Sequence, residues 1–286
     1  MPGRFDHAHV PTSRAALHCV CTGPVNGPAL LLLHGWPQTW FMWRDVIPPL
    51  AQAGYRVIAA DLTGLGDSTR PADGYDKMTI ARDMAELMAA LGHENYGAVA
   101  HDWGGPVAFA LAAQFPERVR AMAVFDAPVL GDGGPIEHHN RWHFGFHALP
   151  GLPEALTGGR EDTYLRFFYA FGGARTDAIA EAAQAEYVRA YSQPGAMTAG
   201  FNYYRAVPQD IADNTAFRET GKRLEMPILV YGGDPATRGR GLTALESWQR
   251  VASKVSGGVA QGCGHWIPEE DPTFTALEVL RHFAQI

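Results

Sequence analysis

Cysteine and long apolar runs are scarce in this 286-residue sequence. The three cysteines have no metal-binding spacing, and Cys19 and Cys21 lie two positions apart in an expected strand, where a disulfide would be strained. No apolar run approaches the ~20 residues that span a bilayer, and the first residues lack the apolar segment of a signal peptide. These absences predict a reduced, cytoplasmic protein that does not insert into membranes.

Positive charge is also in short supply. Lysine and arginine number 23 against 30 aspartates and glutamates, which gives a formal net charge of −7. An acidic surface disfavours nucleic acid as the main partner. Hydrophobic residues make up 47% of the chain, enough for a packed core, and the sequence contains 12 histidines.

Short apolar segments alternate with amphipathic ones along most of the chain. The strands are expected at residues 15–22, 29–35, 55–61, 96–102, 119–127, 226–234 and 256–262. The helices are expected at residues 40–53, 78–92, 104–115, 242–252 and 274–286. In the second of these helices, an apolar stripe recurs at helical spacing: Ile80, Met84, Leu87, Met88 and Leu91. Near-continuous apolar strands separated by helices predict an α/β fold, with a mostly parallel sheet covered on both faces.

This alternation breaks between residues 130 and 220, where aromatic-rich helical segments replace the strands. We therefore expect a core domain formed by residues 1–129 and 221–286, interrupted by a helical cap domain at 130–220. Because ligands bind beyond the carboxyl ends of the strands in such sheets, an insertion that leaves from those ends would roof the site.

The segment YGAVAHDWGG carries the strongest chemical signal. An apolar strand runs into Asp102, and small residues flank the turn before the next helix begins. This pattern is typical of a nucleophile elbow, with Asp102 in the place of the nucleophile. A helix-capping role for Asp102 is the alternative, but the flanking glycines disfavour it.

A second polar loop, His34-Gly35-Trp36-Pro37, follows an earlier strand. The backbone N–H groups of Trp36 and Trp103 are expected to form an oxyanion hole near the elbow. His34 is expected to hold this loop in place by hydrogen bonds.

His265 lies in a glycine-rich loop near the end of the chain, so the nucleophile precedes the histidine, as this kind of fold requires. An acid is needed to orient its ring. Asp126 and Asp234 both follow strands, and the residues alone leave both open.

The motifs HGWP, HDWGG and GCGHW resemble those of α/β-hydrolase-fold enzymes with an aspartate nucleophile, chiefly epoxide hydrolases and haloalkane dehalogenases. The chain is most similar to a bacterial group, the Cif-like epoxide hydrolases. That similarity extends into WHFGF at 142–146 and FNYYRAV at 201–207.

The resemblance implies a cofactor-free enzyme, small-molecule epoxide substrates and a possible homodimer. It assigns the orienting acid to Asp126, where the group usually has Glu, and the ring-opening donors to His143 and Tyr204. Trp103 is a second departure, since this group can have an aliphatic residue after the nucleophile. Trp36 and Trp103 would also line the substrate site.

Carboxylate attack on a saturated carbon yields an alkyl ester, which water activated by a histidine can hydrolyse. The sequence therefore predicts an epoxide hydrolase that forms vicinal diols through an ester on Asp102, hydrolysed with the help of His265. A haloalkane dehalogenase with the same nucleophile is the first alternative, and a non-catalytic ligand receptor is the second.

A metal site is a further possibility, because His139, His143 and His147 recur every four residues. No carboxylate completes the set at a suitable spacing. We expect a cap and surface histidine cluster there, with no metal and no cofactor.

Overall fold

The computed structural model describes residues 5–134 and 142–285. Within them, the strands form one eight-stranded sheet in the order β1-β2-β4-β3-β5-β6-β7-β8. The strands are β1 (Asp6–Pro11), β2 (Ala16–Thr22), β3 (Ala29–Leu33), β4 (Arg56–Ala60), β5 (Tyr96–His101), β6 (Val119–Phe125), β7 (Ile228–Gly233) and β8 (Val255–Ala260). The pairs that β2 makes with β1 and β4 are antiparallel, and all other pairs are parallel. The expected mostly parallel sheet is confirmed.

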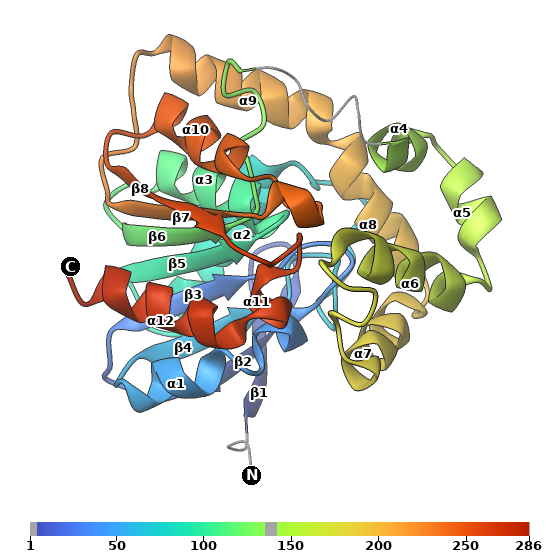
Figure 1. The fold of residues 1–286 in the computed structure, drawn as a ribbon, viewed down its shortest axis with the longest axis horizontal. Coiled ribbons are helices and arrows are strands. Elements are labelled where there is room, and N and C mark those ends of the chain that lie inside the picture. Colours follow the sequence, from blue (N-terminus) through green and yellow to red (C-terminus); the bar gives the residue numbers. More distant parts are fainter. Residues whose placement is uncertain (1–4, 135–141, 286) are drawn as a thin grey trace.

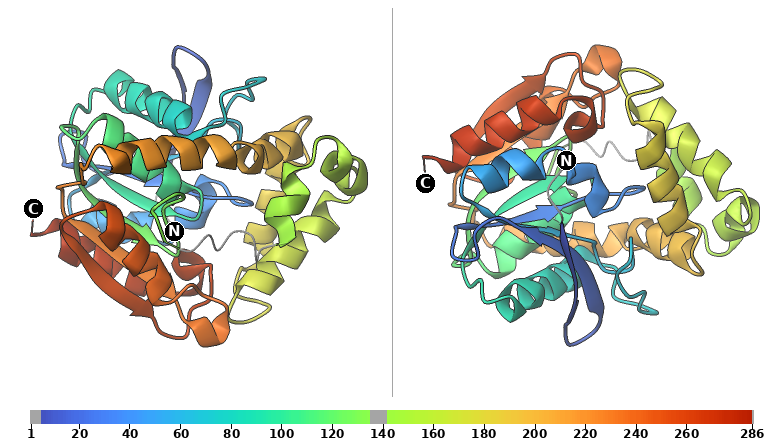
Figure 2. Two further views of the ribbon diagram at one scale, coloured as in Figure 1. Left: turned by 90° about the horizontal axis from the view of Figure 1, so that it is seen from above. Right: turned by 90° about the horizontal axis from the view of Figure 1, so that it is seen from below.

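Helices cover both faces of this sheet (Figures 1 and 2). One face carries α1 (Ile47–Gln52) and α12 (Pro272–Phe283), which contact each other. The other face carries α2 (Lys77–Ala90), α3 (Gly104–Gln114) and α10 (Leu242–Val251). Aromatic packing between Phe109 of α3 and Trp248 of α10 joins the helices of this second face.

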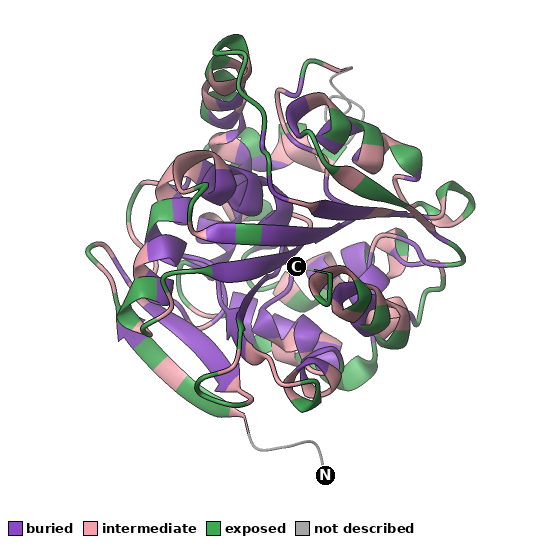
Figure 3. Cartoon of the chain, turned by 90° about the vertical axis from the view of Figure 1, so that its left-hand side faces the viewer, coloured by how far each residue is buried: buried purple, intermediate pink, exposed green. Residues whose placement is uncertain are grey.

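The core follows the apolar pattern of the sequence. Every residue of β3 and β5 is buried. Ile80, Met84, Leu87 and Met88 face inward from α2, while Leu91 lies just beyond the end of the helix. Figure 3 shows buried strands between helices whose outer surfaces are exposed. No helix among the described residues is long and apolar enough to cross a bilayer.

The helix expected at residues 40–53 is wrong as a single element. A short 3₁₀ helix, η1 (Trp40–Trp43), is followed by a separate helix, α1. Two prolines occupy the first turn of α1, where their missing N–H groups need no partner. The expectation also missed β1, which forms the sheet edge beside β2.

The described elements between β6 and β7 are all helices: α4 (Trp142–Ala148), α5 (Leu152–Thr157), α6 (Glu161–Gly172), α7 (Glu181–Tyr191), α8 (Ala196–Arg205) and α9 (Val207–Glu219). The helices α4 to α8 lie together beyond the sheet (Figure 1). In contrast, α9 runs back over the core, where Phe217 packs against Phe109 of α3. The cap boundaries at 130 and 220 therefore remain a prediction.

A buried ion pair connects the core to this helical segment. Lys77, the first residue of α2, places Nζ 2.8 Å from Oδ2 of Asp210 in α9. The other carboxylate oxygen of Asp210 accepts a hydrogen bond from the backbone N–H of Lys77. Lys77 Nζ also donates to the carbonyl of Tyr203 in α8 and lies 4.1 Å from the Trp103 ring centroid. Because a lone buried charge is costly, this pair favours one seating of α8 and α9 on the core.

Candidate active site

Asp102 stands in the sharp turn between β5 and α3, with φ of 49°. A positive φ is uncommon for a residue other than glycine, and it indicates a turn that the surrounding fold holds in place. Gly35 allows this approach, because a Cβ there would lie 2.3 Å from Oδ1 of Asp102. Strand, turn and helix thus present the Asp102 carboxylate at the carboxyl edge of the sheet.

Both oxygens of Asp102 have polar neighbours. Oδ1 accepts a hydrogen bond from the backbone N–H of Trp36 at 2.9 Å, and Oδ2 lies 3.3 Å from Nε2 of His265. Burial would raise the pKa of Asp102, but the hydrogen bond and the charge of His265 hold it well below its usual value. Trp103 occupies the N-cap of α3, where the first N–H groups have no partner within the helix.

Of the two candidate acids, Asp126 is the one beside His265. Its Oδ2 lies 2.6 Å from His265 Nδ1, and its Oδ1 accepts a hydrogen bond from the backbone N–H of Gly233. Asp234 instead uses its side chain to accept hydrogen bonds from backbone N–H groups, those of Ala236 and Gly262. The structure therefore brings Asp102, His265 and Asp126 together, while Asp234 shapes a nearby turn.

Arg240 is a site residue that the sequence analysis missed. Its Nη1 lies 3.0 Å from Oδ2 of Asp126 and 3.2 Å from Nδ1 of His265. Burial would raise the pKa of Asp126, but the Arg240 cation and the His265 hydrogen bond keep it well below its usual range. Arg240 lies in the loop after η3 (Pro235–Thr237), where no motif spacing marks it, so only the folded chain reveals the contact.

The backbone around His265 is fixed from three directions. Glu270, at the end of α11 (Ile267–Glu270), accepts hydrogen bonds from the N–H groups of Gly264 and Trp266. The N–H of His265 donates to the carbonyl of Gly172 in α6, and its carbonyl accepts from Nε2 of His101. Gly264 is required for this close packing, since a Cβ there would lie 2.6 Å from the Gly172 carbonyl oxygen.

The two predicted donors from the helical segment lie beside each other. The ring centroids of His143 in α4 and Tyr204 in α8 are 5.7 Å apart. Tyr204 is buried, and its ring packs edge-on against Trp103 at 4.9 Å and Trp36 at 5.7 Å. Burial, together with the nearby Asp102 charge, raises the pKa of Tyr204 well above its usual value. Tyr203 points elsewhere, because its hydroxyl donates to the Thr63 carbonyl.

His147 of α4 also packs against Tyr204. The sequence alone placed His147 only in a cap and surface histidine cluster and did not predict this contact. Its ring centroid lies 4.4 Å from that of Tyr204, and its Nε2 is 2.6 Å from the Tyr164 hydroxyl. Burial, and next the charge of His143, lowers the pKa of His147 to about 2, so the ring is neutral. The alternative metal set included His139, which lies outside the described residues.

Two buried indole donors lie near the nucleophile. Among the described residues, Nε1 of Trp36 has no hydrogen-bond partner, whereas the Trp103 side chain is close enough to Tyr204 for a hydrogen bond that opposes the rise in the pKa of that hydroxyl. The Trp36 donor lies against α8, where a Cβ on Gly200 would be 2.6 Å from it. The Trp103 indole belongs to the residue directly after Asp102, so its N–H is placed to donate a hydrogen bond to a group that departs near the nucleophile.

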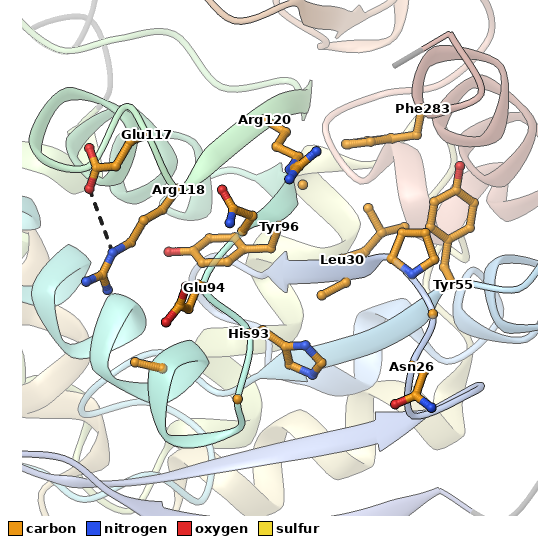
Figure 4. A pocket seen from close by; sticks show the side chains of 17 residues that line it. Asn26, Leu30, Tyr55, His93, Glu94, Tyr96, Glu117, Arg118, Arg120 and Phe283 are labelled. Atoms are coloured by element: carbon orange, nitrogen blue, oxygen red, sulfur yellow. Dashed lines mark ion pairs between the residues drawn. The ribbon is translucent and has the colours of Figure 1, made fainter.

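A separate hollow of about 1060 Å³ lies at the opposite edge of the sheet, at the amino ends of β3, β5 and β6. Figure 4 shows Tyr96, His93 and Arg118 among its lining side chains. Asp102 and Asp126 follow the carboxyl ends of β5 and β6, and His265 lies in the loop after β8. The hollow lies at the amino ends of the strands, so it is remote from these three residues.

Comparison with known proteins gives consistent matches. The family described as "alpha/beta hydrolase fold" matches residues 28–272. The chain is 37% identical over 284 residues to a soluble epoxide hydrolase of Corynebacterium sp. (strain C12), with 94% of each chain covered. Cfl2 from Burkholderia cenocepacia superposes with a TM-score of 0.89 at 35% identity, over 98% of this chain and 95% of that one. The epoxide hydrolase CorEH superposes with a TM-score of 0.89 at 35% identity, over 99% of each chain.

Proposed function

The chain belongs to the α/β hydrolase fold family, and we propose that it is an epoxide hydrolase that converts an epoxide and water into a vicinal diol. The observation that carries this proposal is the aspartate at the elbow, with Oδ2 of Asp102 3.3 Å from His265 Nε2. A serine nucleophile would form an ether at a saturated carbon, which water does not readily cleave. An aspartate forms an ester, which water can cleave.

In the first step, Oδ2 of Asp102 attacks one ring carbon from the side opposite the epoxide oxygen. A carbon–oxygen bond forms to the enzyme, and the ring carbon–oxygen bond breaks. The departing oxygen needs a proton, which Tyr204 supplies while His143 donates a hydrogen bond. Burial and the Asp102 charge keep the Tyr204 hydroxyl protonated at neutral pH, so it has a proton to supply.

In the second step, His265 takes a proton from water as the water oxygen attacks the acyl carbon of the ester. Oδ1 of Asp102 becomes the oxyanion, and it already accepts a hydrogen bond from Trp36 N–H at 2.9 Å. The backbone N–H of Trp103 is the second proposed donor to this oxyanion. Asp126 stabilises the imidazolium of His265.

Collapse of the intermediate breaks the acyl carbon–oxygen bond and releases the diol, whose second oxygen takes the proton from the His265 imidazolium. The remaining proton of water is left on the regenerated Asp102 carboxyl group, from which it returns to Tyr204. The protons therefore balance without a cofactor.

A single turnover in heavy-oxygen water tests this route, with the enzyme in excess over a panel of epoxides. We expect one heavy oxygen in the peptide that contains Asp102 and ordinary oxygen in the first diol formed. Enzyme kept in heavy-oxygen water without substrate is the control. Diol formation by an Asp102→Ala variant would overturn the proposal.

Haloalkane dehalogenation is the second candidate, because the buried indole of Trp103 directly follows the nucleophile and an indole N–H can stabilise a departing halide. Halide release from a haloalkane panel tests it under the same conditions. Saturable binding of both panels without diol or halide would instead favour the receptor alternative.

We also propose a cytoplasmic homodimer. The three cysteines are reduced and buried, which suits a reducing compartment, and the family resemblance supports the dimer. Light scattering on the purified chain would report its mass, and cell fractionation would report its location.

A further inference from the structure

Three histidines gather on one face of the β1–β2 hairpin, apart from the proposed catalytic residues. His7 and His9 are two positions apart in β1, so their side chains share a face. His9 lies directly opposite His18 of β2 in the antiparallel register. The ring centroid of His18 is 5.2 Å from that of His7 and 5.0 Å from that of His9.

A buried carboxylate orients the central ring. Nδ1 of His18 donates a hydrogen bond to Oδ2 of Asp61 at 2.7 Å, and both side chains are almost completely buried. In a neutral ring with this tautomer, Nε2 of His18 carries the lone pair, and Nε2 lies 2.9 Å from Nδ1 of His7. Asp61 is itself held by the N–H groups of Trp40 and Asp67. A carboxylate behind an imidazole is the arrangement that fixes the tautomer of a histidine metal ligand.

We propose that His7, His9 and His18 form a binding site for a divalent transition-metal ion such as Zn²⁺, with Asp61 supporting His18. Two histidines from one strand and one from its neighbour supply three imidazole ligands and leave a fourth position for water or a carboxylate. This proposal is independent of the epoxide chemistry, which uses none of these residues.

His7 and His18 already hold their ligand nitrogens close to the separation that a bound zinc ion requires. Zinc–nitrogen bonds of about 2.0–2.1 Å in a tetrahedron separate two ligand nitrogens by about 3.3 Å. The nitrogens of His7 and His18 are 2.9 Å apart and now share a proton, which the ion would replace. The three histidines do not yet place their ligand nitrogens within 4.8 Å of one another, so the ring of His9, an exposed residue on an edge strand, would have to rotate toward the same point.

The electrostatic surroundings favour a cation. Ligand atoms of His18, Asp61 and Asp67 lie within 4.8 Å of one another. Asp67 is partly exposed and currently pairs with Arg189 at 2.9 Å, so its carboxylate is close enough to serve as the fourth ligand. A bound ion would tie the edge strand β1 to β2 through side chains as well as through the backbone ladder.

The test is calorimetric titration of the full chain with Zn²⁺, in two buffers of different ionisation enthalpy. We expect one ion per chain, release of protons on binding, and a visible d–d spectrum with Co²⁺ in its place. His7→Gln and His9→Gln each remove a proposed ligand, so each should weaken Zn²⁺ binding by at least the ~10-fold that loss of an outer-shell partner causes. Both residues are exposed, so these variants are expected to fold.

A His138→Gln/His139→Gln double variant is the matched control, because it removes the neighbouring histidines from the other histidine-rich segment. Its Zn²⁺ affinity should equal that of the unmodified chain. The proposal is overturned if the unmodified chain binds no stoichiometric Zn²⁺. It is equally overturned if His7→Gln and His9→Gln bind Zn²⁺ as tightly as the unmodified chain, whatever the control variant does.

Discussion

Nη1 of Arg240 lies 3.0 Å from Oδ2 of Asp126, the same oxygen that contacts His265. The proposed orienting acid is thus shared between the proposed base, His265, and the cation of Arg240. Such sharing moderates how strongly Asp126 favours the protonated ring. We therefore expect Arg240 to set the pH at which His265 becomes an effective base.

Replacing Arg240 by Gln should move the acid limb of ester hydrolysis to higher pH. In the free protein, burial alone would lower the pKa of His265, but hydrogen bonds to Asp102 and Asp126 raise it, and Arg240 opposes that rise. In the ester, Asp102 carries no charge, so Asp126 and Arg240 are the two opposing charges beside the ring. The base works only when neutral, so the rate increases as pH rises through the pKa of His265. Without the cation this pKa rises further, because the opposing positive charge is removed.

Single-turnover hydrolysis of the ester, followed between about pH 4 and pH 9, would measure this shift in the pKa of His265. Arg238→Gln is the matched control, since Arg238 is in the same loop but donates to the Phe171 carbonyl. An acid limb that stays in place in Arg240→Gln would refute the role of this arginine.

Replacing His265 by Gln should trap the ester. Attack by Asp102 does not need a base, whereas hydrolysis does, so the variant should be alkylated and then turn over ~10²–10⁴-fold more slowly. Mass spectrometry of the intact protein would show the added mass of one epoxide. A variant that reaches the steady state with no trapped ester would contradict the assignment of His265 to the second step.

Replacing Tyr204 by Phe should slow ring opening by ~10²–10³-fold, because one donor to the developing alkoxide is lost. The rate of formation of the ester, followed by rapid quench, measures that step directly. Tyr203→Phe is the control from the same helix, because its hydroxyl bonds to the Thr63 carbonyl. Equal losses in the two variants would remove Tyr204 from the ring-opening step.

Replacing Asp210 by Ala should lower the free energy of unfolding by ~3–5 kcal/mol, because Lys77 would be left as an uncompensated buried charge. Urea denaturation measures this change. Asp213→Ala, on the same helix, removes only a contact with Gln209 and should have a small effect. A Lys77→Met/Asp210→Leu double variant should recover most of the loss, and failure to recover would point to a role beyond charge pairing.

Much of the fold is predictable because its elements are locally encoded. Apolar runs such as β3 and the helical stripe of α2 identify buried elements, and the glycines around Asp102 mark the elbow. The prolines of α1 were also visible, yet their effect was misjudged, since prolines that open a helix look the same in sequence as prolines inside one.

The sequence by itself determined the α/β order of elements, the aspartate at the elbow and the glycine-rich loop that carries His265. Each of these features is encoded by residues that are neighbours in the chain. The residues alone left Asp126 and Asp234 open, although the family resemblance favoured Asp126. They placed His147 only in a cap and surface histidine cluster, and they did not indicate Arg240 or the Lys77–Asp210 pair. These contacts join positions far apart in the chain: Asp126 and Arg240, for example, are 114 residues apart. Only the tertiary structure decides them, because close packing of sheet and helices selects which distant charges share a buried space.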